Sequence, residues 1–253
     1  MASMSAEQLR VAVGYFVPVE LQRRNLQCEP VFGELATRSF KMVSESDLQQ
    51  IQPWCKWRGI TTYLDCLAFA DRAARELPKG PNLGLQHVTP GQFYAAGEIF
   101  FAQAMIDNIA SWLCEALPMA VAGGERNFGK VAFVRQLEQR PGANELLHTH
   151  KGFVKEVNRY RQVWIHTLAG GVIPLVDDDP FLNPQGANRH LGVPIDPAIN
   201  VDEPGYMKRV EECAKQNEGR YCYAIDEFTQ RIFEGAWRFY LGWLHFSLNS
   251  LSE

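Results

Sequence analysis

The longest well-delimited helix that the sequence predicts begins at Thr89, and it constrains the fold more than any other feature. Thr89 can cap the helix, and Pro90 occupies the first helical position, where its missing amide hydrogen is not needed. An apolar stripe of this length must be buried against other helices, so the sequence predicts a helical bundle. The stripe continues at helical spacing to about Leu117 and comprises Phe93, Ala96, Phe100, Ala104, Ile109 and Trp112.

Other segments show the same helical spacing and complete a single predicted domain over 1–253, helical over 45–171. The helix that begins near His150 ends where Gly170 and Gly171 favour a helix terminus. The chain is therefore predicted to be mainly α. The predicted helices are Thr61–Leu77, Phe128–Gln139 and a helix from near His150 to Leu168.

A long C-terminal helix is predicted over residues 207–251. Trp237, Tyr240 and Trp243 make it more aromatic than a solvated helix tolerates. The helix is therefore expected to be buried within the fold or to form an interface between subunits. The second alternative, with Trp237, Tyr240 and Trp243 buried between subunits, predicts a homo-oligomer.

Two segments depart from helical spacing. Residues 10–44 are predicted to form a small N-terminal β element. The reason is an alternation of apolar residues at period two, at Val11, Val13, Tyr15, Val17 and Val19. Residues 172–206 contain six prolines, which predicts a long irregular loop.

Composition excludes several classes of protein. With 46% hydrophobic residues and a net charge of -4, the chain is an ordinary globular protein without a global positive field, so any contact with nucleic acid needs a local patch. No apolar run of about 20 residues and no leader pattern is present, so we expect a cytoplasmic protein that does not enter membranes. The six cysteines form no metal-binding or disulfide pattern, and no cofactor motif occurs.

Residues 151–171 form the strongest candidate for chemistry. A step of about 100° per residue places an apolar stripe on one face of this helix and a polar row on the other, with Arg161 between them. A cation, an amide and an imidazole along one line could hold a phosphate and move a proton. The stripe consists of Phe153, Val157, Tyr160, Trp164 and Leu168, and the row of Lys155, Arg159, Gln162 and His166.

This helix resembles the HEPN family (higher eukaryotes and prokaryotes nucleotide-binding), helical bundles with an Arg-x4–6-His motif in a late helix. The motif is Arg161-x4-His166 or Arg159-x6-His166. The resemblance implies a metal-independent RNase, or an inactive relative that binds RNA or a nucleotide. It implies that His166 assists proton transfer at a ribose 2′-hydroxyl or its leaving group, that an Arg stabilises the phosphorane, and that two copies meet across a dimer cleft.

Other functions and sites remain open at this stage. An ordinary solvated face explains the same polar row, and a second match, Arg238-x6-His245, lies where packing is the expected role. A non-catalytic helical interaction protein and a bundle that binds a small molecule or cofactor are the alternative functions. The remaining candidates are His148 with His150 and Asp177 to Asp179 as metal ligands, Arg189 with His190 as an anion site, and Cys114 and Cys222, expected to be inert.

Overall fold

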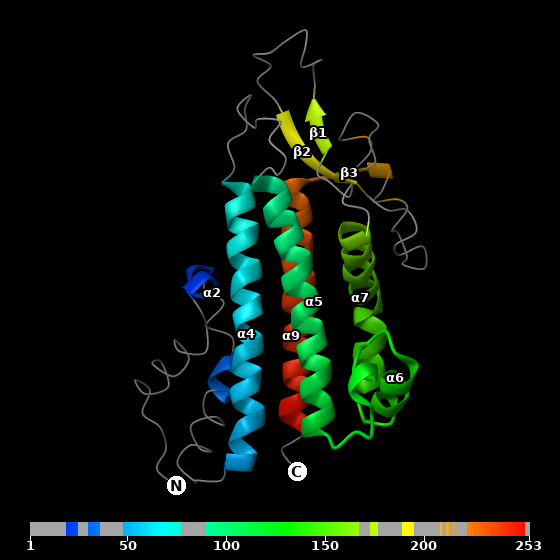
Figure 1. The fold of residues 1–253 in the computed structure, drawn as a ribbon. Helices are drawn as coiled ribbons and strands as arrows, with labels where there is room; N and C mark the ends of the chain where they lie inside the picture. Colours follow the sequence, from blue (N-terminus) through cyan, green and yellow to red (C-terminus); the bar gives the residue numbers. More distant parts are fainter. Residues whose placement is uncertain are drawn as a thin grey trace. The chain divides into compact units, whose positions relative to one another are not determined.

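A computed structural model gives the fold, which is mainly α (Figure 1). None of the helices in the part of the chain described below combines the length and apolar character needed to cross a membrane. The helices are α2 (Val19–Arg23), α4 (Leu48–Arg75), α5 (Pro90–Ala116), the 3-10 helix η2 (Gly123–Glu125), α6 (Val131–Glu138), α7 (Ala143–His166) and α9 (Ile225–Ser250). The structure describes residues 19–24, 30–35, 48–76, 90–166, 173–176, 189–194, 208, 211–212, 215 and 222–250.

The chain divides into two compact units. Unit 1 contains residues 1–68, 104–151 and 236–253, and unit 2 contains residues 69–103 and 152–235. Each of the helices α4, α5, α7 and α9 contributes residues to both units. Because both units are assembled from separate stretches of chain, no linker in the sequence marks where one ends.

The predicted helices exist, but some begin earlier than expected. Helix α5 begins at Pro90 and ends at Ala116, close to its predicted bounds, but Phe93 and Phe100 of its predicted buried stripe are exposed. Helix α4 begins at Leu48, well before Thr61. Helix α7 begins at Ala143, directly after Gly142, whose φ of 79° is the left-handed conformation that glycine adopts readily. The chain therefore turns at Gly142, and His150 lies inside the helix.

The N-terminal β element is not seen among the described residues. The part of 10–44 that the structure describes is helical, namely α2 and residues 30–35. Val19, which the alternating pattern assigned to a strand, begins α2. Residues 1–18 and 36–47, which carry the rest of this prediction, lie outside the described part of the chain.

A three-stranded antiparallel sheet lies in unit 2, in strand order β1-β2-β3. Strands β1 (Ile173–Val176) and β2 (Arg189–Pro194) fall within 172–206, so this segment is not wholly irregular as predicted. Pro174 is tolerated because β1 is an edge strand, and Pro194 because it is the last residue of β2. Strand β3 (Cys222–Ala224) interrupts the predicted 207–251 helix, so α9 begins only at Ile225.

Aromatic packing forms the core of unit 1. The rings of Trp57 and Trp112 meet edge to face at 4.7 Å between centroids, and the Tyr240 ring lies 5.7 Å from that of Trp57. The Thr61 and Tyr240 hydroxyls hydrogen-bond at 2.7 Å. Burial raises the pKa of the Tyr240 hydroxyl, so it stays protonated. Helix α9 is therefore tied to α4 by both apolar and polar contacts.

Two of the three aromatic side chains that the sequence singled out in α9, Tyr240 and Trp243, are buried within the chain itself, whereas Trp237 is half-buried. Tyr240 and Trp243 have no exposed surface. Trp243 packs against Phe128 at 5.0 Å between ring centroids, and Trp237 stacks on Phe32 at 5.8 Å. Each such pair contributes about 0.5–1.5 kcal/mol beyond its buried area. Tyr240 and Trp243 are therefore not available for an interface between subunits.

Candidate functional site

Helix α7 carries the row that the sequence predicts as functional. Lys155, Arg159 and Gln162 are exposed, whereas Val157 and Tyr160 are buried, which confirms the predicted polar and apolar faces for these residues. Arg161 is also exposed. His166 is the last residue of α7, and its side chain lies outside the described residues.

Helix geometry distinguishes the two arginines that could act with His166. Seven residues separate positions 159 and 166, and a step of about 100° per residue returns to within about 20° of the starting direction. Five residues separate positions 161 and 166, which leaves them about 140° apart. Within one copy of α7, position 159 therefore shares a stripe with position 166, and position 161 does not.

The buried side of α7 is fixed against α9 in unit 2. The contacting residues run in opposite directions along α7 and α9. These contacts fix the rotation of α7 about its own axis, and Arg159 and Gln162 therefore face solvent. The Phe153 ring lies so close to Gly235 that a Cβ there would stand 2.5 Å from Cδ2, and the rings of Tyr160 and Phe228 meet edge to face at 5.0 Å. The contacting pairs, in order along α7, are Phe153 with Gly235, Glu156 with Arg231, and Tyr160 with Phe228.

The central contact is a buried ion pair that the sequence analysis missed. The Glu156 side chain is 4% exposed and accepts two hydrogen bonds from Arg231, Nε to Oε1 at 2.9 Å and Nη2 to Oε2 at 3.0 Å. The Arg231 guanidinium also lies over the Tyr223 ring, 5.8 Å from its centroid. A signal was present, because Glu156 follows Phe153 by three residues and precedes Tyr160 by four. An acid at this position on an apolar stripe needs a buried cation.

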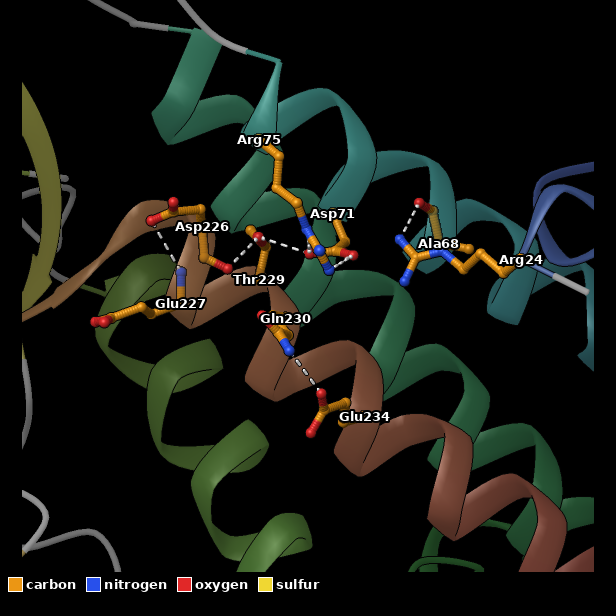
Figure 2. A network of polar contacts seen from close by, with 9 residues as sticks. All are labelled: Arg24, Ala68, Asp71, Arg75, Asp226, Glu227, Thr229, Gln230 and Glu234. Atoms are coloured by element: carbon orange, nitrogen blue, oxygen red, sulfur yellow. Dashed lines mark hydrogen bonds and ion pairs between the residues drawn. The ribbon is translucent and has the colours of Figure 1, made fainter. Parts of the chain in front are cut away.

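A second buried carboxylate joins α4 to α9 in unit 2 (Figure 2). The Asp71 side chain has no exposed surface. Arg75 donates to it through Nη2 at 2.6 Å and Nε at 3.1 Å, and the Thr229 hydroxyl donates at 3.2 Å. The hydrogen bonds to Asp71 raise the pKa of Arg75, which keeps the guanidinium charged. With three donors, the buried charge is satisfied, and we assign Asp71 a structural role.

The histidine pair of α7 does not form a metal site. His148 is exposed and His150 is buried, and residues two apart on a helix point about 160° away from each other. A single ion therefore cannot bind both. Over the described ranges, no group of three or more His, Cys, Asp or Glu residues could hold a metal ion.

His150 is instead a buried neutral imidazole in unit 1. It is 8% exposed, and its ring meets Phe239 edge to face at 5.3 Å. Burial, together with the positive charge of Arg238, lowers the pKa of His150 to about 4. The imidazole is therefore uncharged at neutral pH.

We expect this histidine to make stability depend on pH. His150 takes up a proton near pH 6.5 in the unfolded chain but only near pH 4 in the folded chain. Its contribution to the free energy of unfolding is therefore complete above pH 6.5 and is lost as the pH falls toward 4. The loss should be about 3 kcal/mol between pH 7.5 and 4. Urea denaturation at several pH values measures it. His150→Phe should remove this dependence and His148→Phe should keep it; equal pH slopes in wild type and His150→Phe would contradict the assignment.

The other candidates have different outcomes. Asp177 to Asp179 lie outside the described residues. His190 is in β2, opposite Leu175 of β1, and its side chain is not described. Cys114 is buried, and burial raises the pKa of its thiol, which fits the prediction of an inert cysteine.

The second Arg-x6-His match, Arg238 with His245, does not have the packing role that the sequence predicted. Arg238 and His245 are both exposed on α9, although the aromatic surroundings predicted packing. Their spacing of seven residues places them on one stripe of the helix. The aromatic residues of α9 lie on its other faces, so this stripe is polar.

Comparison with known proteins adds no relative. No family model matches the chain, and searches of the curated proteins and of the solved structures gave no significant match. A function can therefore be proposed only from the residues of this chain.

Proposed function

We propose that this chain is a HEPN-like protein that binds RNA along the exposed row of α7 and cleaves it without a metal ion. The observation that supports the proposal is the exposure of Arg159, Arg161 and Gln162 on the same unbroken helix that ends at His166. An inactive relative that binds RNA or a nucleotide would use the same row. Binding and cleavage are therefore tested separately.

The chemistry of the row suits a phosphodiester. A guanidinium can donate two hydrogen bonds to one phosphate and neutralises its charge, and the Gln162 amide can add a neutral donor. Lys155 extends the positive row by about one helical turn toward the N-terminus. Since the whole chain carries a net charge of -4, this local patch supplies the attraction that the global field does not.

The proposed cleavage is a transfer within the RNA strand. The 2′-oxygen attacks the adjacent phosphorus and loses its proton, and the 5′-oxygen leaves and gains one. The products are a 2′,3′-cyclic phosphate and a 5′-hydroxyl. His166 acts as the general acid or base, and an arginine stabilises the negative charge of the phosphorane. Position 159 is favoured for that arginine within one copy of the helix, and position 161 remains available across two copies.

The binding part of the proposal predicts that Arg159→Ala weakens the affinity for single-stranded RNA about tenfold, because a hydrogen bond to a charged group contributes about 1.5 kcal/mol. The slope of log K against log salt should also decrease by about 1. Fluorescence anisotropy with a labelled oligonucleotide measures both quantities. Arg161→Ala, measured in the same way, shows whether both arginines contact phosphate.

The matched control is Arg135→Ala, which removes an exposed arginine from α6. It should leave affinity and salt slope unchanged. If wild type binds no RNA at low salt, or if the Arg135 variant loses as much affinity as the Arg159 variant, the α7 row is not an RNA site.

A further inference from the structure

The first half of α5, which lies in unit 2, exposes large apolar side chains and buries its charged one. Phe93 is 67% exposed and Phe100 is 46% exposed. They are seven residues apart, so both project from one stripe of the helix. Glu98, the only charged residue of 90–103, has no exposed surface. The outer stripe of this half of α5 is therefore apolar and uncharged.

Gly97 lies on the same stripe, between the two exposed rings. Glycine inside a helix is less favourable than alanine, so it needs a reason. Packing within the described part of the chain gives none, because a Cβ here would meet only the Phe101 ring of the same helix, at an ordinary contact distance of 3.6 Å. Ala96, the neighbouring small residue, is half-buried. A shallow position between two exposed rings suits a second surface that approaches the helix from outside.

This stripe is complementary to a second copy of itself. Phe93 and Phe100 are equally far along the helix from the point midway between Ala96 and Gly97. Two α5 helices packed antiparallel about a twofold axis at this point would place Phe93 of each copy against the partner's Phe100. The small residues at the crossing would let the two helix backbones approach closely. Aromatic pairs are favourable when their rings lie edge to face or offset.

Charge favours a second copy over a nucleic acid on this stripe. Residues 90–106 contain no lysine or arginine, and a groove that binds single-stranded RNA combines aromatic side chains with cations. The absence of exposed charge on the stripe also means that two identical copies would not repel each other there.

The exposed area indicates how strong such a pairing would be. A phenylalanine side chain presents about 200 Å², so Phe93 and Phe100 together expose about 230 Å² per copy, or about 450 Å² in a pair. Stable interfaces bury about 1,200–2,000 Å² in total. The rings supply about a third of this area, which corresponds to a dimer that dissociates at micromolar concentration.

We infer that the outer stripe of α5, formed by Phe93, Gly97 and Phe100, is the surface through which two copies of this chain pair in solution. This inference goes beyond the proposed function and does not depend on it, because it uses no residue of the α7 row. The pairing also accounts for Gly97, whose place in the middle of a helix the packing of a single copy does not require.

Sedimentation velocity over about 1–500 µM tests the inference, since a weak dimer forms within this range. Wild type should change from monomer to dimer. The double variant Phe93→Ser with Phe100→Ser should stay monomeric at every concentration. The matched control is Phe69→Ser, which removes an equally exposed phenylalanine, 47% exposed, from α4 and should dimerise like wild type.

Gly97→Leu separates a specific pairing from general apolar adhesion. The variant adds apolar surface and a better helix former, so adhesion would become stronger. A close crossing has no room for the new side chain, so we expect the dissociation constant to rise about tenfold or more. Far-UV circular dichroism should show that the helix content is kept. The inference is wrong if wild type stays monomeric, if the double serine variant dimerises like wild type, or if Gly97→Leu dimerises as tightly as wild type or more tightly.

Discussion

RNA cleavage should fall by about 10²- to 10⁴-fold in the His166→Ala variant, because a general acid or base contributes a factor of this size. RNA affinity should change little, since the proposal assigns the phosphate contacts to the arginines and Gln162 of α7. His166 is the last residue of α7, so its replacement leaves the rest of the helix unchanged. A gel assay with a labelled oligonucleotide, in buffer containing a chelator, measures the rate.

The control for this variant is His148→Ala, which removes an exposed histidine from the same helix. It should cleave RNA at the wild-type rate. The RNase proposal is excluded if purified wild type cleaves no RNA without added metal, or if His166→Ala and wild type cleave equally fast. In the first case, retained RNA binding would identify the chain as an inactive binding relative.

Arg231→Ala should lower the free energy of unfolding by about 3–5 kcal/mol, the typical cost of breaking a buried ion pair from one side. The reason is Glu156, whose side chain is 4% exposed and would stay buried without the two hydrogen bonds that Arg231 donates. Urea denaturation followed by far-UV circular dichroism measures the change. Because this pair fixes the rotation of α7, the variant should also lose RNA affinity.

A double variant distinguishes the pair from simple loss of packing. Glu156→Leu with Arg231→Met removes both charges and keeps apolar volume, so it should recover most of the stability that Arg231→Ala loses. Arg135→Ala, at an exposed site, should stay within about 0.5 kcal/mol of wild type. If Arg231→Ala is no more destabilising than Arg135→Ala, the ion pair does not hold α7.

Local signals were sufficient to predict the start of α5 and the polar and apolar faces of α7. The Pro90 start of α5 depends only on neighbouring residues, and the alternation of Arg159 and Gln162 with Val157 and Tyr160 follows from the helical period. These features do not require knowledge of the partner helix. For the same reason the spacing around His166 could be stated from the sequence, whereas a catalytic role for it stays a proposal.

Features that depend on distant partners were missed. Glu156 needs Arg231 and Asp71 needs Thr229, and both partners lie far away along the chain. Pro194 lies in β2 because Cys222 of β3 provides the neighbouring strand, which the local proline content does not reveal. The aromatic residues of α9 suggested a subunit interface, because the sequence does not show that Phe32 and Phe128 cover them.

The division into two units has a consequence for spectroscopy. Every tryptophan except Trp164 belongs to unit 1, so intrinsic fluorescence reports mainly the unfolding of that unit. Far-UV circular dichroism reports helix in both units. The Glu156–Arg231 pair lies in unit 2, so its loss in Arg231→Ala destabilises that unit. If the units unfold independently, the transition followed by circular dichroism should then differ from the transition followed by fluorescence. Coincident transitions would show that both units unfold as one cooperative structure.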